Sequence, residues 1–180
     1  MNTYIALLRG INVSGHNKIK MVDLQKLFIH MGHSNVLTYI QSGNVIFSSA
    51  ENDISTLEQT IIHEIEKQFN YVIKVLVLKK NELEKIFNFN AFADIHELDF
   101  KKVGVTILQE KPTDEGIEKV QSIAADDEKL IFKEKALYLY CPSGFGRTKL
   151  SNNNIEAKLK MAATSRNWNT ITKLVELSNS

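Results

Sequence analysis

Cysteine and proline are scarce in this chain of 180 residues, which contains one cysteine, Cys141, and two prolines. A single cysteine excludes an internal disulfide, so the fold has to rest on a hydrophobic core, which a chain of this length can bury. It also fits a reducing compartment. Few prolines and no low-complexity tract argue against a flexible linker between domains.

Long apolar runs are missing as well. No stretch approaches the roughly 18 consecutive apolar residues of a membrane helix. The first residues lack the basic region, apolar run and cleavage site of a signal peptide. With 43% hydrophobic and 24% charged residues, the composition is that of an ordinary globular protein. We therefore expect a cytoplasmic protein without a membrane partner.

The net charge of +1 hides a segregation of charges along the chain. Residues 1–22 hold three Lys or Arg and no acid, and residues 135–175 hold seven against one Glu. Residues 23–134 are acidic in balance. Such runs are often only solvated surface. Alternatively, the two cationic ends face each other and draw an anion into one site.

The hydrophobic pattern of the first half predicts a complete supersecondary unit. The order is β-α-β-β-α-β, which is typical of a ferredoxin-like α+β module. A capping-box pattern at residues 55–58 is expected to start the second helix. The predicted elements are strand 3–9, helix 21–31, strands 35–40 and 45–48, helix 55–69 and strand 72–78.

The second half repeats most of this order. It predicts strand 103–108, helix 113–124, and strands 129–133 and 136–141, followed by helices, but no clear fourth strand. We therefore expect two ferredoxin-like modules, 1–79 and 80–180, the second with C-terminal helices. In the first module, a right-handed crossover would bring Arg9 and the turn 42–44 to the same end of the sheet.

Four sequence motifs stand in order along the chain. They are LLRGINVSGHNKIKM (7–21), TYIQSGNVIF (38–47), GFGRTKL (144–150) and TSRNWNTITKL (164–174). Together they resemble the bacterial family known as domain of unknown function 1697. The resemblance implies two ferredoxin-like modules and no established activity.

The motif loops combine glycines, small polar residues and cations, a combination that suits an anion because backbone N–H groups and positive charges converge. The loop 10–20 matches neither a Walker A loop nor the dinucleotide fingerprint. A purely structural loop is the alternative. The candidate anion-binding residues are Arg9, Gly10, Asn12, Lys18, Lys20, Ser42, Gly43, Asn44, Arg147, Lys149, Arg166 and Asn167.

The segment 164–168 precedes a predicted helix, which Thr164 or Ser165 is expected to cap. The N–H groups at that helix start, with Arg166 beside them, would form an anion site. The alternative is a capped helix with Trp168 in the core and Arg166 in a structural ion pair.

Cys141 and Arg147 have the Cys-x5-Arg spacing of cysteine phosphatases. Tyr140 stands where those enzymes carry His, and no motif positions an Asp as general acid. A lone Cys at a strand end is usually a buried small hydrophobe. We therefore disfavour a phosphatase.

Other chemistry has little support in the sequence. No His, Cys or Asp set has metal-site spacing, no catalytic triad can be assembled, and no cofactor is indicated. Tyr4 and Phe47 are the aromatic residues that the strands offer for RNA stacking, but the RNA-binding signature is absent.

The sequence leaves three functions open. The first is a binding module for a phosphorylated or other anionic ligand, either a nucleotide or a nucleic acid. The second is an enzyme on such a ligand, with Arg9, Lys18 or Arg147 as electrophilic clamps. The third is a structural or protein-interaction domain. The catalytic residues, the oligomeric state and the sharing of one site by both cationic ends stay open.

Overall fold

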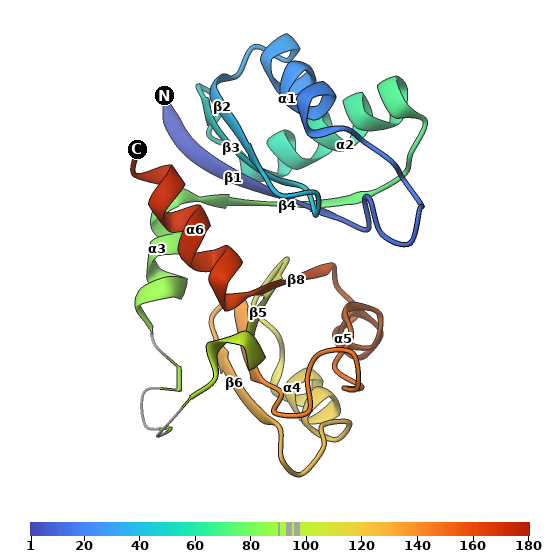
Figure 1. The fold of residues 1–180 in the computed structure, drawn as a ribbon, viewed down its shortest axis with the longest axis vertical. Coiled ribbons are helices and arrows are strands. Elements are labelled where there is room, and N and C mark those ends of the chain that lie inside the picture. The colour runs from blue at the N-terminus through green and yellow to red at the C-terminus, as the bar shows by residue number, and fades with distance from the viewer. Residues whose placement is uncertain (90, 93–94, 96–97) are drawn as a thin grey trace. The chain divides into compact units, whose positions relative to one another are not determined.

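The computed structural model describes residues 1–89, 91, 92, 95 and 98–180. The chain forms two compact units: Met1–Lys85 with Leu174–Ser180, here called the first module, and Ile86–Lys173, the second module. Each unit has its own four-stranded antiparallel sheet with helices (Figure 1). This confirms the α+β class and the two ferredoxin-like modules.

The first module has the predicted element order. Its sheet order is β2-β3-β1-β4, so β1 and β3 are the central strands. The elements are β1 (Asn2–Arg9), α1 (Met21–His30), β2 (Ser34–Tyr39), β3 (Asn44–Ser49), α2 (Ile54–Phe69) and β4 (Lys74–Lys79), followed by α3 (Lys80–Asn88).

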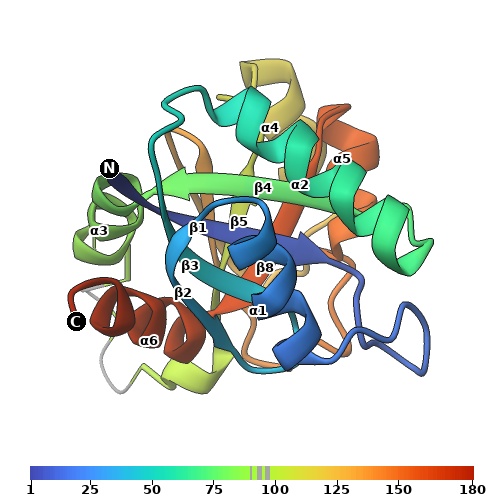
Figure 2. The ribbon, with the colours of Figure 1, turned by 90° about the horizontal axis from the view of Figure 1, so that it is seen from above.

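Strand β1 is buried on both faces, which explains its unbroken apolar sequence. Helices α1 and α2 cover one face of the sheet (Figure 2). Their inward residues, such as Leu24, Phe28 and Ile61, pack with Tyr4 and Phe47 of the sheet in one hydrophobic cluster.

Helix α2 does not start at the predicted capping box. The Asp53 carboxylate accepts hydrogen bonds from the backbone N–H groups of Ser55, at 2.7 Å, and Thr56, at 3.1 Å. An aspartate at this position satisfies the unpaired donors of the first turn, so the helix begins earlier than expected. Glu58 instead accepts a 2.8 Å hydrogen bond from the Val77 N–H.

The second module is complete, which corrects the expectation that it lacks a fourth strand. Its sheet order is β6-β7-β5-β8, and β8 pairs antiparallel with β5. The elements are a 3-10 turn η1 (Phe100–Lys102), β5 (Val103–Leu108), α4 (Asp114–Gln121), β6 (Lys129–Lys133), β7 (Ala136–Tyr140), α5 (Asn152–Leu159), β8 (Ala163–Asn167) and α6 (Trp168–Ser178).

Strand β8 escaped detection because its sequence, Ala-Thr-Ser-Arg-Asn, is almost wholly polar. Its polar side chains form hydrogen bonds inside the module, so the strand is held without a hydrophobic alternation. The apolar cluster of the module includes Leu108, Leu137, Leu139 and Ile155. None of the helices in the described part of the chain is long and apolar enough to cross a membrane.

Candidate functional site

The end of β1 lies beside the β2–β3 turn, as predicted. Leu7 stands opposite Asn44, and the Leu8 N–H donates a 2.8 Å hydrogen bond to the Gly43 carbonyl. The Asn12 side chain donates to the Gln41 carbonyl at 2.9 Å, which ties the loop 10–20 to the same turn. The convergence of the two N-terminal motifs at one end of the sheet is therefore confirmed.

Gly43 is required at this junction for two reasons. Its φ of +78° is a conformation that side chains disfavour. A Cβ at this position would also lie 2.6 Å from Ile11 Cδ1 and 2.8 Å from Leu8 Cβ. The motif glycine thus serves close packing between the loop and the strand.

The side-chain amides of this region hold the loop itself. Asn12 accepts from the Ile19 N–H and donates to the Ile19 carbonyl, both at 2.9 Å. Asn17 donates to the Gly10 carbonyl at 2.9 Å. Asn44 is fully buried and donates to the Tyr39 carbonyl and to the Ser42 hydroxyl. These bonds are internal to the loop and the turn.

The cations of this region are more accessible. Lys18 and Lys20 are exposed, and Arg9 is partly buried and stands opposite Lys74 of β4. Their anion-binding role stays a prediction, as does a site shared with the cationic residues of the second module.

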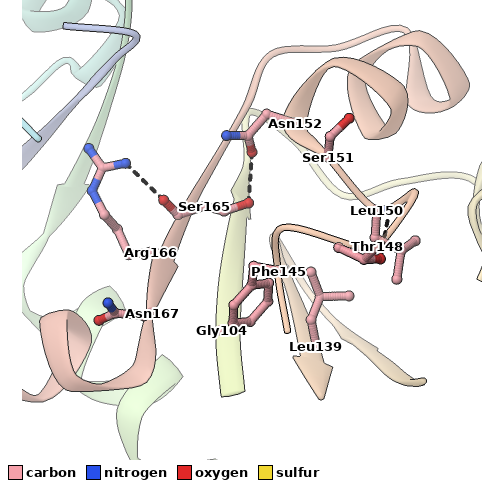
Figure 3. Close-up of a pocket in the computed structure, with 10 residues that line it drawn as sticks. All are labelled: Gly104, Leu139, Phe145, Thr148, Leu150, Ser151, Asn152, Ser165, Arg166 and Asn167. Carbon is pink, nitrogen blue, oxygen red and sulfur yellow. Dashed lines mark hydrogen bonds between the residues drawn. The ribbon is translucent and has the colours of Figure 1, made fainter. Parts of the chain in front are cut away.

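A pocket of about 390 Å³ lies in the second module, near the first residues of β5 (Figure 3). Five segments that are distant in sequence contribute to it: β5, β7, the loop after β7, the start of α5 and the end of β8. Its lining residues are Gly104, Leu139, Phe145, Thr148, Leu150, Ser151, Asn152, Ser165, Arg166 and Asn167.

The ring of Phe145 covers Gly104. A Cβ at Gly104 would lie 2.8 Å from Phe145 Cζ and 3.3 Å from the Arg166 carbonyl oxygen. A glycine inside a strand often marks such a close approach. Although its ring rests on the strand, Phe145 is 38% exposed. The pocket therefore has an accessible aromatic wall.

A chain of hydroxyl and amide groups forms the polar wall. The Thr106 and Ser165 hydroxyl oxygens lie 2.7 Å apart, and Ser165 donates to the Asn152 side-chain oxygen at 2.7 Å. Because the single hydroxyl proton of Ser165 is donated to Asn152, Thr106 is the donor in the hydrogen bond between Thr106 and Ser165. This chain fixes the Asn152 amide and points its NH₂ group away from Ser165.

Helix α5 begins at the pocket. Ser151 is its N-cap, and the hydroxyl accepts from the Asn154 N–H at 3.3 Å. The first turn of a helix carries a partial positive charge from its aligned N–H groups. Lys102 lies beside the loop after β7, since its Nζ is 3.3 Å from where a Cβ on Gly144, the neighbour of Phe145, would stand.

Arg166 lines the pocket from β8, but its guanidinium lies on the other side of the strand from the Ser165 hydroxyl (Figure 3). It donates to the Thr164 hydroxyl and to the Ser165 carbonyl, both at 2.9 Å. Burial lowers the pKa of Arg166 to about 10. The side chain is therefore still protonated at neutral pH and acts as a fixed charge.

Thr164 and Ser165 are not helix caps, contrary to expectation, because both lie in β8. The cap of α6 is Asn167, whose side-chain oxygen accepts a 2.8 Å hydrogen bond from the Thr170 N–H. Trp168 is partly buried, with its ring stacked 5.6 Å from that of Phe87.

Arg147 and Lys149 line a different hollow of about 280 Å³. It also includes Asp127 and Glu128, so the two cations share it with two carboxylates. Thr148 lines both hollows. Of the predicted site residues in the second module, the larger pocket thus brings together only Arg166 and Asn167.

Cys141 is fully buried. Burial raises the pKa of its thiol to about 12, and the nearby Glu128 carboxylate adds to this shift. The Gly144 N–H donates to the Cys141 carbonyl at 2.8 Å, and the Arg147 N–H donates to the Gly144 carbonyl. These amides form turns within the loop and the thiol stays protonated, so both observations argue against a phosphatase.

Tyr4 and Phe47 are unsuited to stacking RNA bases. Both are fully buried under the helices, with ring centroids 5.7 Å apart. Among the residues that the structure describes, no group of three or more His, Cys, Asp or Glu is arranged to hold a metal ion.

Sequence reasoning missed much of this pocket. Phe145 and Thr148 belong to a recognised motif but were not assigned to the site, and Gly104 gave a signal only as a glycine within a predicted strand. Ser151 and Asn152 had no local signal, because they reach the pocket only once the sheet and α5 have packed together.

Comparison with known proteins supports the family and the fold. A family model described as a protein of unknown function (DUF1697) matches residues 1–138. A solved structure of a conserved bacterial protein from Streptococcus pneumoniae has 23% identity to this chain, covers 98% of both chains and gives a TM-score of 0.78. At this identity the likeness shows a shared fold alone. No curated protein matches the chain.

Proposed function

We propose that this chain, which belongs to the protein family of unknown function DUF1697, binds a small phosphorylated ligand with a planar ring, of the nucleotide type. The observation that carries the proposal is the pocket of the second module, in which an exposed aromatic ring faces fixed polar groups. Its volume of about 390 Å³ falls in the range of pockets that hold small molecules.

The aromatic wall suits the base. The far end of the Phe145 ring lies against Gly104, and the side chain is 38% exposed. A flat π-face of this kind can stack on a nucleobase with little regard to which base it is. The side-chain amides of Asn152 and Asn167 line the same pocket and offer donors to carbonyl oxygens on a ring or a sugar phosphate.

The start of α5 suits the phosphate. Its N–H groups and the macrodipole favour an anion near Ser151 and Asn152. Lys102 adds a full positive charge beside Gly144, the neighbour of Phe145. The Arg166 guanidinium lies on the other side of β8 from the Ser165 hydroxyl and contributes charge only at longer range.

Binding is favoured over catalysis by the protonation of the lining groups. Arg166 keeps its proton at neutral pH, and the other residues that line the pocket are apolar, hydroxyl or amide groups. Such groups position a ligand but are not suited to accept a proton near pH 7.

Isothermal titration calorimetry on the full chain tests the proposal, with a mononucleotide panel, ribose 5-phosphate and a short single-stranded oligonucleotide as probes. We expect the mononucleotides to bind most tightly. Phe145→Leu should weaken nucleotide binding about tenfold, because it removes the stacking face and keeps an apolar side chain.

Phe100→Leu is the matched control. Phe100 is also in the second module and is 46% exposed, but does not line the pocket, so its replacement should leave the affinity unchanged. The proposal fails if no mononucleotide binds the wild-type chain, or if both variants weaken binding equally. Tighter binding of the oligonucleotide would instead identify a nucleic-acid partner.

A further inference from the structure

Strand β2 differs from the other sheet edges in its charge. The sheet orders place β2, β4, β6 and β8 at the edges of the two sheets. The other three edge strands carry cations: Lys74 and Lys79 in β4, Lys129 and Lys133 in β6, and Arg166 in β8. Strand β2 carries no Asp, Glu, Lys or Arg, and neither does any position in residues 27–50.

Edge strands normally carry charges because unpaired backbone N–H and C=O groups attract another strand. A lysine opposes that pairing, since it would have to be desolvated. Strand β2 lacks this protection, and its one irregularity in pairing with β3 lies between Ser34 and Leu37. From Leu37 to Tyr39 the pairing is regular, so the outer side of this stretch offers a regular edge.

Apolar side chains accompany this edge. Leu37, 41% exposed, stands opposite Ile46, which is outside the helix-facing cluster, and Ile40, 46% exposed, follows the strand. Neighbouring exposed apolar residues of this kind usually mark an interaction surface.

We infer that the β2 edge is a homodimer surface, on which β2 of a second copy of this chain pairs antiparallel. A two-fold interface contains each residue of the edge strand twice, so an edge strand that carries cations and no acid would gather like charges there without a counter-charge. The other three described edge strands, β4, β6 and β8, each carry cations and no acid, whereas β2 carries no charged side chain. The pairing would join the two first-module sheets into one continuous sheet.

The test is the oligomeric state of the full chain, measured by sedimentation velocity over a range of concentrations. The expected result is a monomer–dimer equilibrium. Leu37→Lys places two ammonium groups at the two-fold interface and should raise the dimer dissociation constant roughly 100-fold. Leu37 is exposed, so the fold should survive, and a circular dichroism spectrum verifies this.

Val72→Lys is the matched control, because Val72 is 79% exposed in the same module and lies just before β4, at the opposite edge of the sheet. It should leave the dimer intact. Hydrogen exchange adds a local measure: the amides of residues 37–39 should become more protected as the concentration rises. A wild-type chain that stays monomeric overturns the inference. A dimer that Leu37→Lys leaves unchanged, or that both variants weaken equally, also overturns it.

Discussion

The two modules share one strand order but carry their long polar loops at different connections. In the first module the long loop, residues 10–20, follows β1, and the connection after β3 is short, residues 50–53. In the second module the order is reversed: residues 109–113 follow β5, and the long loop, residues 141–151, follows β7. Because β7 runs antiparallel to β5, its loop lies where β5 starts. The long loops therefore lie at opposite ends of the equivalent central strands β1 and β5.

The difference extends to the use of the polar groups. Asn12, Asn17 and Asn44 of the first module form hydrogen bonds with backbone groups of their own loop and turn. In the second module, Asn152 and Ser165 lie beside a pocket with an accessible ring. A repeated fold thus supplies two similar scaffolds, and in the second module the long loop after β7 contributes Phe145, Thr148 and Leu150 to a pocket.

The substitution with the largest expected effect on stability is Gly43→Ala, in the first module. The new Cβ would meet Ile11 and Leu8 and would hold a φ of +78°. Overpacking and the left-handed conformation together should destabilise the protein by about 3 kcal/mol. Urea denaturation followed by circular dichroism measures this change.

Gly10→Ala separates the two causes. Gly10 also has a positive φ, +73°, but no atom lies within 4 Å of its would-be Cβ. Gly10→Ala should therefore destabilise the protein by only about 1 kcal/mol, which is the cost of the left-handed backbone conformation alone. Equal losses in the two variants would show that close packing at Gly43 contributes nothing.

Gly104→Ala is the corresponding change in the second module and should have a smaller effect on stability. Here the Cβ would meet the far end of the Phe145 ring, which is partly exposed and can move. We expect a loss of about 1 kcal/mol in urea denaturation, together with weaker nucleotide binding in calorimetry as the ring leaves its place. A loss as large as that of Gly43→Ala would contradict the contrast between a packed loop and an adaptable pocket.

Sequence reasoning succeeded for elements with a strong apolar pattern. Strand β1 and strand β5 were predicted almost to the residue because they are central and buried. Strand β8 was missed because Thr164, Ser165 and Arg166 are polar. Arg166 donates to the Thr164 hydroxyl within the strand, and Ser165 bonds the distant Thr106, a partner that the local sequence does not reveal. The pocket was missed for the same reason, since Gly104, Phe145 and Asn152 meet only after the sheet has formed.

His33 makes the stability of the first module depend on pH. Its ring packs against those of Phe28 and Phe47, its Nε2 is buried without a hydrogen-bond partner, and burial lowers its pKa below 6.5. The folded state then binds a proton less readily than the unfolded chain. The free energy of unfolding is therefore not reduced by His33 above the pKa that this residue has in the unfolded chain, and it falls as the pH drops below that pKa.

His33→Phe should flatten this dependence, because phenylalanine keeps an aromatic ring and cannot titrate. Urea denaturation at about pH 8 and about pH 5.5 brackets the ordinary pKa of histidine and measures the difference. If the variant loses as much stability on acidification as the wild type, the effect belongs to other groups.

Cys141 provides the smallest expected effect and the last contrast between the modules. It directly follows β7, whereas the equivalent position after β3 is Ala50, which is exposed. Because the thiol is buried and its pKa is raised to about 12, it should react with a thiol reagent such as DTNB only after unfolding. Cys141→Ser should cost about 1 kcal/mol of stability and leave nucleotide binding unchanged, since Cys141 does not line the pocket. Rapid labelling of the native chain, or lost binding in the serine variant, would show that the thiol takes part in the site. Slow labelling with intact binding would leave Phe145, Asn152 and the start of α5 as the groups that make the second module different from the first.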